Sequence, residues 1–75
     1  MATIRERNHP VVENILKVME AKGISIDELS RRSGIHIEDL YRLLKNKKII
    51  RPYEIAVLSM ALKTDVDALF EQTDE

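Results

Sequence analysis

The sequence predicts an all-α protein, folded as one compact bundle of five helices. Apolar residues recur at helical spacing over most of the chain, and no strand-like alternation of apolar and polar residues persists. The 75 residues suffice for one small domain with a single modest core. A hydrophobic fraction of 44% and a charged fraction of 33% are typical of a folded globular domain rather than a disordered chain. Because the predicted loops between the helices are short, the helices must pack directly against one another.

The chain is expected to begin with a polar, flexible N-terminal arm at residues 1–9, and the domain proper is expected to span residues 10–71. Its first helix is predicted at residues 10–22. Pro10 suits the first turn of this helix, and Gly23 can end it as a C-terminal cap. One apolar stripe is predicted to face the core, formed by Val12, Ile15, Leu16 and Met19.

A second helix is expected at residues 26–33. Ser25 can cap its start, and Glu28, three residues further on, would complete a capping box. Gly34 follows the last residue and stops the helix. The residues expected to face inward are Ile26, Leu29 and Ser33.

Three further helices are expected at residues 36–46, 52–63 and 65–71, with a frayed tail at residues 72–75. Pro52 suits the first turn of the fourth helix because its missing N–H would have no partner there. The predicted core residues of these helices are Leu40, Leu43, Leu44, Ile55, Leu58, Leu62, Val66, Leu69 and Phe70.

The charge is small in total but unevenly distributed. A net charge of −1 by itself argues against a nucleic-acid partner. Residues 1–53, however, carry 11 Lys and Arg against 7 Asp and Glu, whereas residues 54–75 carry one against six. Five basic residues follow one another without an intervening acid, namely Arg42, Lys45, Lys47, Lys48 and Arg51. This run is either a solvated loop balanced by an acidic tail or the electrostatic footprint of a nucleic-acid site.

Several functional classes find no support in the residues. The chain has no cysteine, and His9 and His36 have no second ligand at a metal-binding spacing. There is neither a glycine-rich phosphate loop nor a visible nucleophile–base pair, so we expect no enzymatic activity, no cofactor and no metal. No apolar run approaches the roughly 20 residues of a membrane span, and the polar N-terminus does not resemble a signal peptide. A cytoplasmic protein is expected.

The segment from Ile26 to Lys45 meets the requirements of a helix-turn-helix. Such a motif needs a small residue where two helices cross and a residue that tolerates positive φ at the turn. Ser30 and Gly34 fit these two positions. The motif also needs apolar residues that lock the second helix onto the first, and these are Leu29, Ile35, Leu40 and Leu43.

Two stretches, KGISIDELSRRSGI and LSMALKTDVDALF, resemble the lambda-repressor-like helix-turn-helix family of the Cro/C1 or XRE type. The resemblance extends from about Val11 to Phe70 and implies a five-helix lambda-repressor-like bundle. Members of this family typically bind double-stranded DNA as repressors, often as two-fold dimers, and their third helix enters the major groove. The resemblance therefore implies a sequence-specific transcriptional regulator, with a repressor of bacterial, phage or plasmid origin expected.

Carried over position by position, the resemblance assigns base reading to His36, Ile37, Glu38, Tyr41 and Arg42. Arg42 is the best candidate for direct readout, because its planar fork can grip the edge of a guanine. Glu38 could accept from a cytosine amino group, and Tyr41 could donate to phosphate or pack on a thymine methyl. Ile37 offers apolar contact. The structural alternative is that Tyr41 and Arg42 are plain surface residues.

The resemblance assigns phosphate contacts to two places. The lysines after the reading helix would hold the DNA backbone, and the amides at the start of the second helix could cap a phosphate. The predicted phosphate-binding residues are Ser25, Ile26, Lys45, Asn46, Lys47, Lys48 and Arg51. Ile26 departs from the family, which often has Gln at that position.

Glu38 and Asp39 place two negative charges in the first turn of the predicted reading helix. Acids there also favour the helix dipole, by about 0.3–1 kcal/mol. For Asp39, a capping contact back to His36 is the favoured interpretation, whereas Glu38 stays open between base contact and a structural role.

A homodimer is expected to form through a second apolar surface. The fourth helix reads IAVLSMAL and is apolar on nearly all sides, which indicates burial on more than one side. The predicted dimer residues are Ile49, Ile50, Val57, Met60 and Phe70. The alternative is a core that uses more of this helix. A symmetric dimer would bind a palindromic operator.

Two functions thus remain open: a DNA-binding regulator, or a protein-interaction module such as an antirepressor or co-regulator on the same scaffold. The acids at Glu38 and Asp39, the apolar Ile37 and Leu44 and the near-neutral charge favour the second. The operator, the inducing signal, the direction of regulation and the presence of an effector domain after residue 75 stay open as well.

Overall fold

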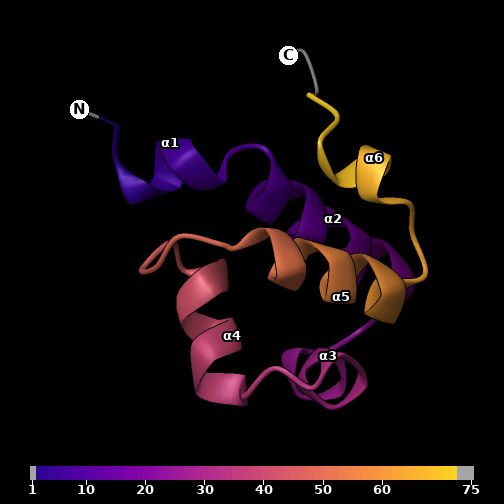
Figure 1. Cartoon of the computed structure of the whole chain (residues 1–75). Coiled ribbons are helices and arrows are strands. Elements are labelled where there is room, and N and C mark those ends of the chain that lie inside the picture. The colour runs from indigo at the N-terminus through magenta and orange to yellow at the C-terminus, as the bar shows by residue number, and fades with distance from the viewer. Residues whose placement is uncertain (1, 73–75) are drawn as a thin grey trace.

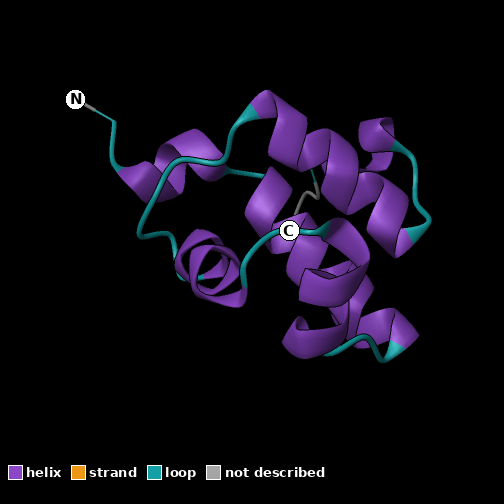
Figure 2. Ribbon diagram, turned by 60° about the horizontal axis from the view of Figure 1, so that its bottom comes forward, coloured by secondary structure: helices purple, strands orange, loops and turns teal. Residues whose placement is uncertain are grey.

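The computed structural model describes residues 2–72, and six helices lie within this range (Figure 1). They are α1 (Ile4–Asn8), α2 (Val11–Lys22), α3 (Ile26–Ser33), α4 (Ile37–Leu44), α5 (Pro52–Leu62) and α6 (Val66–Leu69). Helices and loops account for all the described residues, as Figure 2 shows, so the all-α fold class is confirmed with one helix more than expected. The ends of α2 to α6 lie within two residues of the predicted ends. Of the predicted tail, residues 73–75 lie outside the described range.

The segment expected to be a flexible arm is corrected to a short capped helix, α1. The Thr3 hydroxyl accepts from the Glu6 amide at 3.1 Å, and the Glu6 carboxylate accepts from the Thr3 amide at 2.8 Å. These reciprocal bonds form a capping box, which the sequence TIRE already contains. At the other end of α1, Asn8 is only 1% exposed. The arm is therefore ordered by a local cap and by a buried polar anchor.

The two predicted glycine stops are confirmed. Gly23 ends α2 at φ 67° and Gly34 ends α3 at φ 78°, both in the left-handed region that favours glycine. Ser25 caps α3 by accepting from the amide of Glu28 at 3.1 Å. Glu28 does not complete a capping box with Ser25, and its carboxylate pairs with Arg32 one turn further along instead.

Residues from α2 to α6 meet in one core. Its fully buried members are Ile15, Leu29, Leu40, Leu43, Leu58, Leu62 and Leu69. Three residues predicted for the core are instead exposed: Leu16 at 42%, Val66 at 40% and Phe70 at 50%. On α2 the residues that face the core include Val11 and Ile15, and Leu16 lies at the edge of this buried face. Helix α6 has a single turn, and only its Leu69 faces the core.

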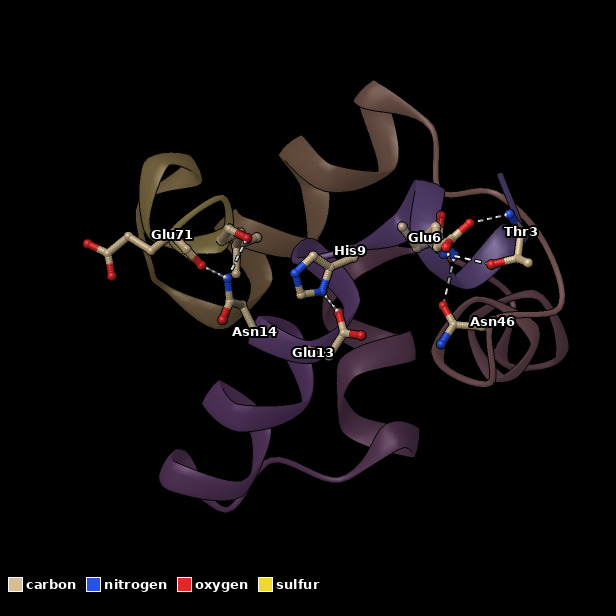
Figure 3. A network of polar contacts seen from close by, with 9 residues as sticks. Thr3, Glu6, His9, Glu13, Asn14, Asn46 and Glu71 are labelled. Atoms are coloured by element: carbon tan, nitrogen blue, oxygen red, sulfur yellow. Dashed lines mark hydrogen bonds and ion pairs between the residues drawn. The ribbon is translucent and has the colours of Figure 1, made fainter. Parts of the chain in front are cut away.

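The helices are arranged so that the helix-turn-helix and the C-terminal helix lie on different sides of the bundle. In Figure 1, α2 and α5 occupy the middle, with α3 and α4 below and α6 above. α3 packs against α4 and α5, and α6 packs against α2 and α5. Asn14 on α2 holds the end of α6 by donating to the carbonyls of Leu69 and Glu71, each at 2.7 Å (Figure 3).

Candidate nucleic-acid interface

The helix-turn-helix is locked by the residues that the sequence predicts for it. Leu29 of α3 and both Leu40 and Leu43 of α4 are 0% exposed. At the crossing, the Ser30 hydroxyl donates to the Ile35 carbonyl at 2.6 Å. The turn is closed further by Ser33, whose hydroxyl accepts from the Ile35 amide at 3.1 Å. α4 is therefore fixed against α3 with one face buried and the opposite face outward.

The outward face of α4 carries the residues predicted to read bases. Ile37, Glu38, Tyr41 and Arg42 are all exposed, with Tyr41 at 54%. Together with Ile26 from the first turn of α3 they line one shallow hollow of about 530 Å³. The structure thus brings four of the five predicted base-facing residues together. It also places Ile26, predicted to face phosphate, among them.

His36 stands apart from these four. It is the N-cap of α4, and its ring Nδ1 accepts from the amide of Glu38 at 3.2 Å. It lines a different, polar hollow that also contains Arg51 and Tyr53. The imidazole therefore takes the place of the Ser or Thr cap that helices favour.

The two acids of the first turn differ in their surroundings. The capping contact expected from Asp39 back to His36 is not formed. The Asp39 carboxylate lies 3.9 Å from the Arg42 guanidinium instead, with both side chains about half exposed. An exposed pair at this distance contributes little to stability, so Arg42 can exchange it for a better partner. Glu38 is exposed and lines the hollow together with the apolar residues.

The basic run after α4 divides into exposed cations and a structural one. Lys45 and Lys47 are exposed, and the Lys45 ammonium lies 5.3 Å from the centre of the Tyr41 ring. Arg51 is exposed at the start of α5. Lys48, predicted to contact phosphate, is instead 27% exposed and lies 3.7 Å from the carboxylate of Glu54, which is 3% exposed. The charge of Lys48 therefore neutralises a buried acid.

Asn46, also predicted to contact phosphate, is turned toward α1. It adopts a left-handed backbone at φ 59°, and its side-chain oxygen accepts from Asn8 at 3.1 Å (Figure 3). Asn8 also donates to the Lys48 carbonyl at 2.9 Å and accepts from the Ile50 amide at 2.9 Å. Through these bonds, the single buried side chain of Asn8 anchors the loop at residues 45–51. No local pattern in the sequence indicates this role of Asn8, because its partners lie about 40 residues further along the chain.

Residues 14–75 match the Cro/C1-type helix-turn-helix DNA-binding domain. The chain belongs to this family. The comparisons with curated proteins and with solved structures found no match. The match begins within α2, so α1 and the Asn8 anchor precede the part that defines the Cro/C1-type domain.

Membership of the Cro/C1-type family makes this chain a DNA-binding regulatory domain that binds double-stranded DNA. The geometry above agrees, because a helix is held with one face outward and cations lie just beyond its end. Within residues 2–72, no helix combines the length and the apolar composition needed to cross a membrane.

The residues predicted for a dimer interface do not form one patch in this Cro/C1-type domain. Ile50 is corrected to a core residue, because it is 8% exposed and its amide is bound by Asn8. Met60 is 76% exposed and lines a shallow hollow with the half-buried Val57. Ile49 and Phe70 are 41% and 50% exposed, but the loop before α5 and helix α6 lie toward opposite ends of α5 (Figure 1).

Proposed function

We propose that this chain is a sequence-specific repressor that binds duplex operator DNA and reads the major groove with α4. The observation that carries the proposal is the orientation of α4. Leu40 and Leu43 are fully buried, so Tyr41 and Arg42 must point away from the bundle. An α-helix presented in this way fits the width of the major groove.

Arg42 and Glu38 would supply the polar part of the readout. The guanidinium of Arg42 can donate two bonds to the O6 and N7 atoms of a guanine. The carboxylate of Glu38 can accept from the N4 amino group of a cytosine. Because these residues are one helical turn apart, they would reach neighbouring base pairs.

Lys45, Lys47 and Arg51 would hold the DNA backbone. All three are exposed and follow α4 in the loop at residues 45–51 or at the start of α5. Each phosphate neutralised changes the slope of log affinity against log salt by about −0.9. Three contacts in each protomer therefore predict a slope near −3 for a monomer and near −5 for a dimer.

The proposed repressor acts as a two-fold homodimer through Val57 and Met60 of α5. A methionine that is 76% exposed beside a second apolar side chain is the most prominent apolar feature of this helix. Two-fold pairing would present two copies of α4 to half-sites about one helical turn apart, roughly 34 Å. The operator would then be palindromic, and the protein would be associated with DNA in the cytoplasm.

The experiment is a selection of bound sequences from random duplex DNA, followed by affinity measurements over a salt series. A palindromic site and a steep salt dependence are expected. Arg42→Ala should relax the preference at one position by about 1–3 kcal/mol. Arg31→Ala removes an exposed arginine of α3 outside the hollow and should leave that preference unchanged. Recovery of no preferred sequence at low salt would refute the proposal.

A protein-interaction module is the second candidate, because the outward face of α4 combines the exposed apolar Ile37 and Tyr41 with the acidic Glu38. In that case the chain would bind a purified protein partner in a fixed ratio. Arg42→Ala would then leave partner binding unaltered, and duplex DNA would be bound without sequence preference even at low salt. These outcomes separate the two candidates in one set of proteins.

A further inference from the structure

The hollow on the outward face of α4 has an apolar floor. Its apolar lining comes from Ile26, Ile37 and Tyr41, and its charged lining from Glu38 and Arg42. Ile26 is half-buried and also packs against the core, so its position is fixed. Ile37 is 37% exposed, and this large apolar side chain therefore keeps part of its surface open to a ligand.

Helix geometry sorts these residues into two rows. Ile37 and Tyr41 are four residues apart and lie on one face of α4, with Ile26 beside them from α3. Glu38 and Arg42 form a second row, displaced by one residue around the same helix. A ligand that enters the hollow thus meets hydrocarbon on one side and a carboxylate and a guanidinium on the other.

The edge of a base pair in the major groove offers one apolar group, the methyl group on C5 of a pyrimidine. Thymine carries it, whereas the other edge groups are hydrogen-bond donors and acceptors that need polar partners. 5-Methylcytosine carries the same methyl group beside its N4 amino group. An apolar hollow of this kind favours the methyl and leaves a polar edge unsatisfied.

We propose that the hollow binds the C5-methyl group of a pyrimidine in the operator, an inference that rests on the proposed DNA-binding function. Duplex DNA is the occupant favoured by charge, because Arg42 lines the hollow and Lys45 lies over the ring of Tyr41. Contact with this methyl makes Ile37, Ile26 and Tyr41 specificity-determining residues. They act beside the hydrogen bonds of Arg42.

Glu38 distinguishes the two sources of the methyl group. Next to C5, thymine presents the O4 acceptor, which a carboxylate repels, whereas 5-methylcytosine presents the N4 amino donor, which a carboxylate can bind. The side of the hollow that holds Glu38 therefore favours a methylated cytosine over a thymine. The N4 amino group is present with or without the methyl group, so cytosine methylation of the operator would strengthen binding through contact of the added methyl with the apolar side of the hollow.

The test uses the full chain and the operator obtained by selection from random DNA. Each thymine in turn is replaced by deoxyuridine, which removes only the methyl group, and each cytosine by 5-methylcytosine, which adds only that group. At one position of each half-site, we expect removal to weaken binding, or addition to strengthen it, by about three- to fivefold. A response to removal identifies thymine as the source, and a response to addition identifies 5-methylcytosine.

Ile37→Ala should lower this methyl effect to less than 1.5-fold, and Tyr41→Ala, which removes another wall of the hollow, should do the same. Ile4→Ala is the matched control, because Ile4 is 36% exposed on α1 and lies outside the hollow. It should keep the full effect. Since Ile37 and Tyr41 are surface residues, circular dichroism should show wild-type folding of both variants.

Two results would overturn the inference while the proposed function stands. One is an operator bound specifically whose affinity changes by less than 1.5-fold with every methyl removed or added. The other is a methyl effect that Ile37→Ala leaves undiminished. Failure to select any operator is a different result, which refutes the proposed function and this inference with it.

Discussion

Removal of the Asn8 side chain tests how the fold positions its basic loop. Asn8 is 1% exposed and joins α1 to the loop at residues 45–51 through three hydrogen bonds. Asn8→Ala breaks all three bonds at once. Of the three partner groups, the Ile50 amide is buried, whereas the Asn46 side chain and the Lys48 carbonyl are partly exposed and can bind water instead.

The magnitude follows from this difference. A buried amide without a partner costs about 1–3 kcal/mol, and each bond that water can replace is worth about 0.5–1 kcal/mol. Asn8→Ala should therefore lower the free energy of unfolding by about 2–5 kcal/mol. A domain of this size has only about 4–11 kcal/mol in total. Urea denaturation followed by circular dichroism measures the loss, and an unchanged slope with urea would show that the two-state comparison is valid.

Asn14→Ala is the matched control. Asn14 is also a buried asparagine, but it bonds the carbonyls of Leu69 and Glu71 at the end of α6, far from the basic loop. Both variants should be less stable than the wild type. At a temperature where both are folded, only Asn8→Ala should weaken DNA binding, because only it releases the loop that carries Lys45 and Lys47. A loss of stability below 0.5 kcal/mol for Asn8→Ala, or equal losses of DNA affinity in the two variants, would refute the reasoning.

Four further substitutions test other parts of the structure. Lys47→Ala should reduce the salt slope of DNA binding by about one at wild-type stability. Lys48→Ala should instead lower stability by about 1–3 kcal/mol, because the buried Glu54 keeps the hydrogen bond from the Arg51 amide but loses its opposite charge. A loss of stability in urea melts for Lys47→Ala, or a reduced salt slope at unchanged stability for Lys48→Ala, would contradict these two roles. Gly34→Ala should cost about 1–2 kcal/mol in thermal melts, since φ is 78° and no atom crowds the added methyl group. Met60→Glu should shift sedimentation from dimer to monomer while the melting temperature of the monomer stays constant, and an unchanged dimer would exclude Met60 from the interface.

Features that depend on neighbouring residues could be predicted from the sequence. Gly23 and Gly34 stop their helices because a left-handed residue is needed there, and this need is local. The same holds for Ser25 as a cap and for the 3.6-residue spacing that buries Leu40 and Leu43. The helix-turn-helix is built from such local features, so its position in the chain was predictable.

Features that depend on contacts far along the chain were not predictable. The capping box of α1 is visible in the sequence, but a helix of five residues is too short to be stable alone, and its buried anchor Asn8 depends on residues near position 48. Likewise, Lys48 looked like any other lysine of the basic run until the burial of Glu54 gave it a partner. Ile50 is predicted to lie on an exposed apolar surface, yet Asn8 binds its amide and its side chain is buried in the core.

The near-neutral total charge does not oppose DNA binding once the charges are placed in space. The acids of the C-terminal part include Glu54, which is buried and paired, and Asp65, Asp67 and Glu71 around α6. α6 packs on α2 and α5 and lies across the bundle from α4 (Figure 1). The exposed cations at Arg42, Lys45 and Lys47 lie on α4 or directly after it, so the molecule has a basic end and an acidic end. Salt screens charges beyond about 8–10 Å, so the electrostatic potential near a surface depends mainly on the nearest charges. The basic end that carries α4 can therefore attract a polyanion even though the net charge of the chain is −1.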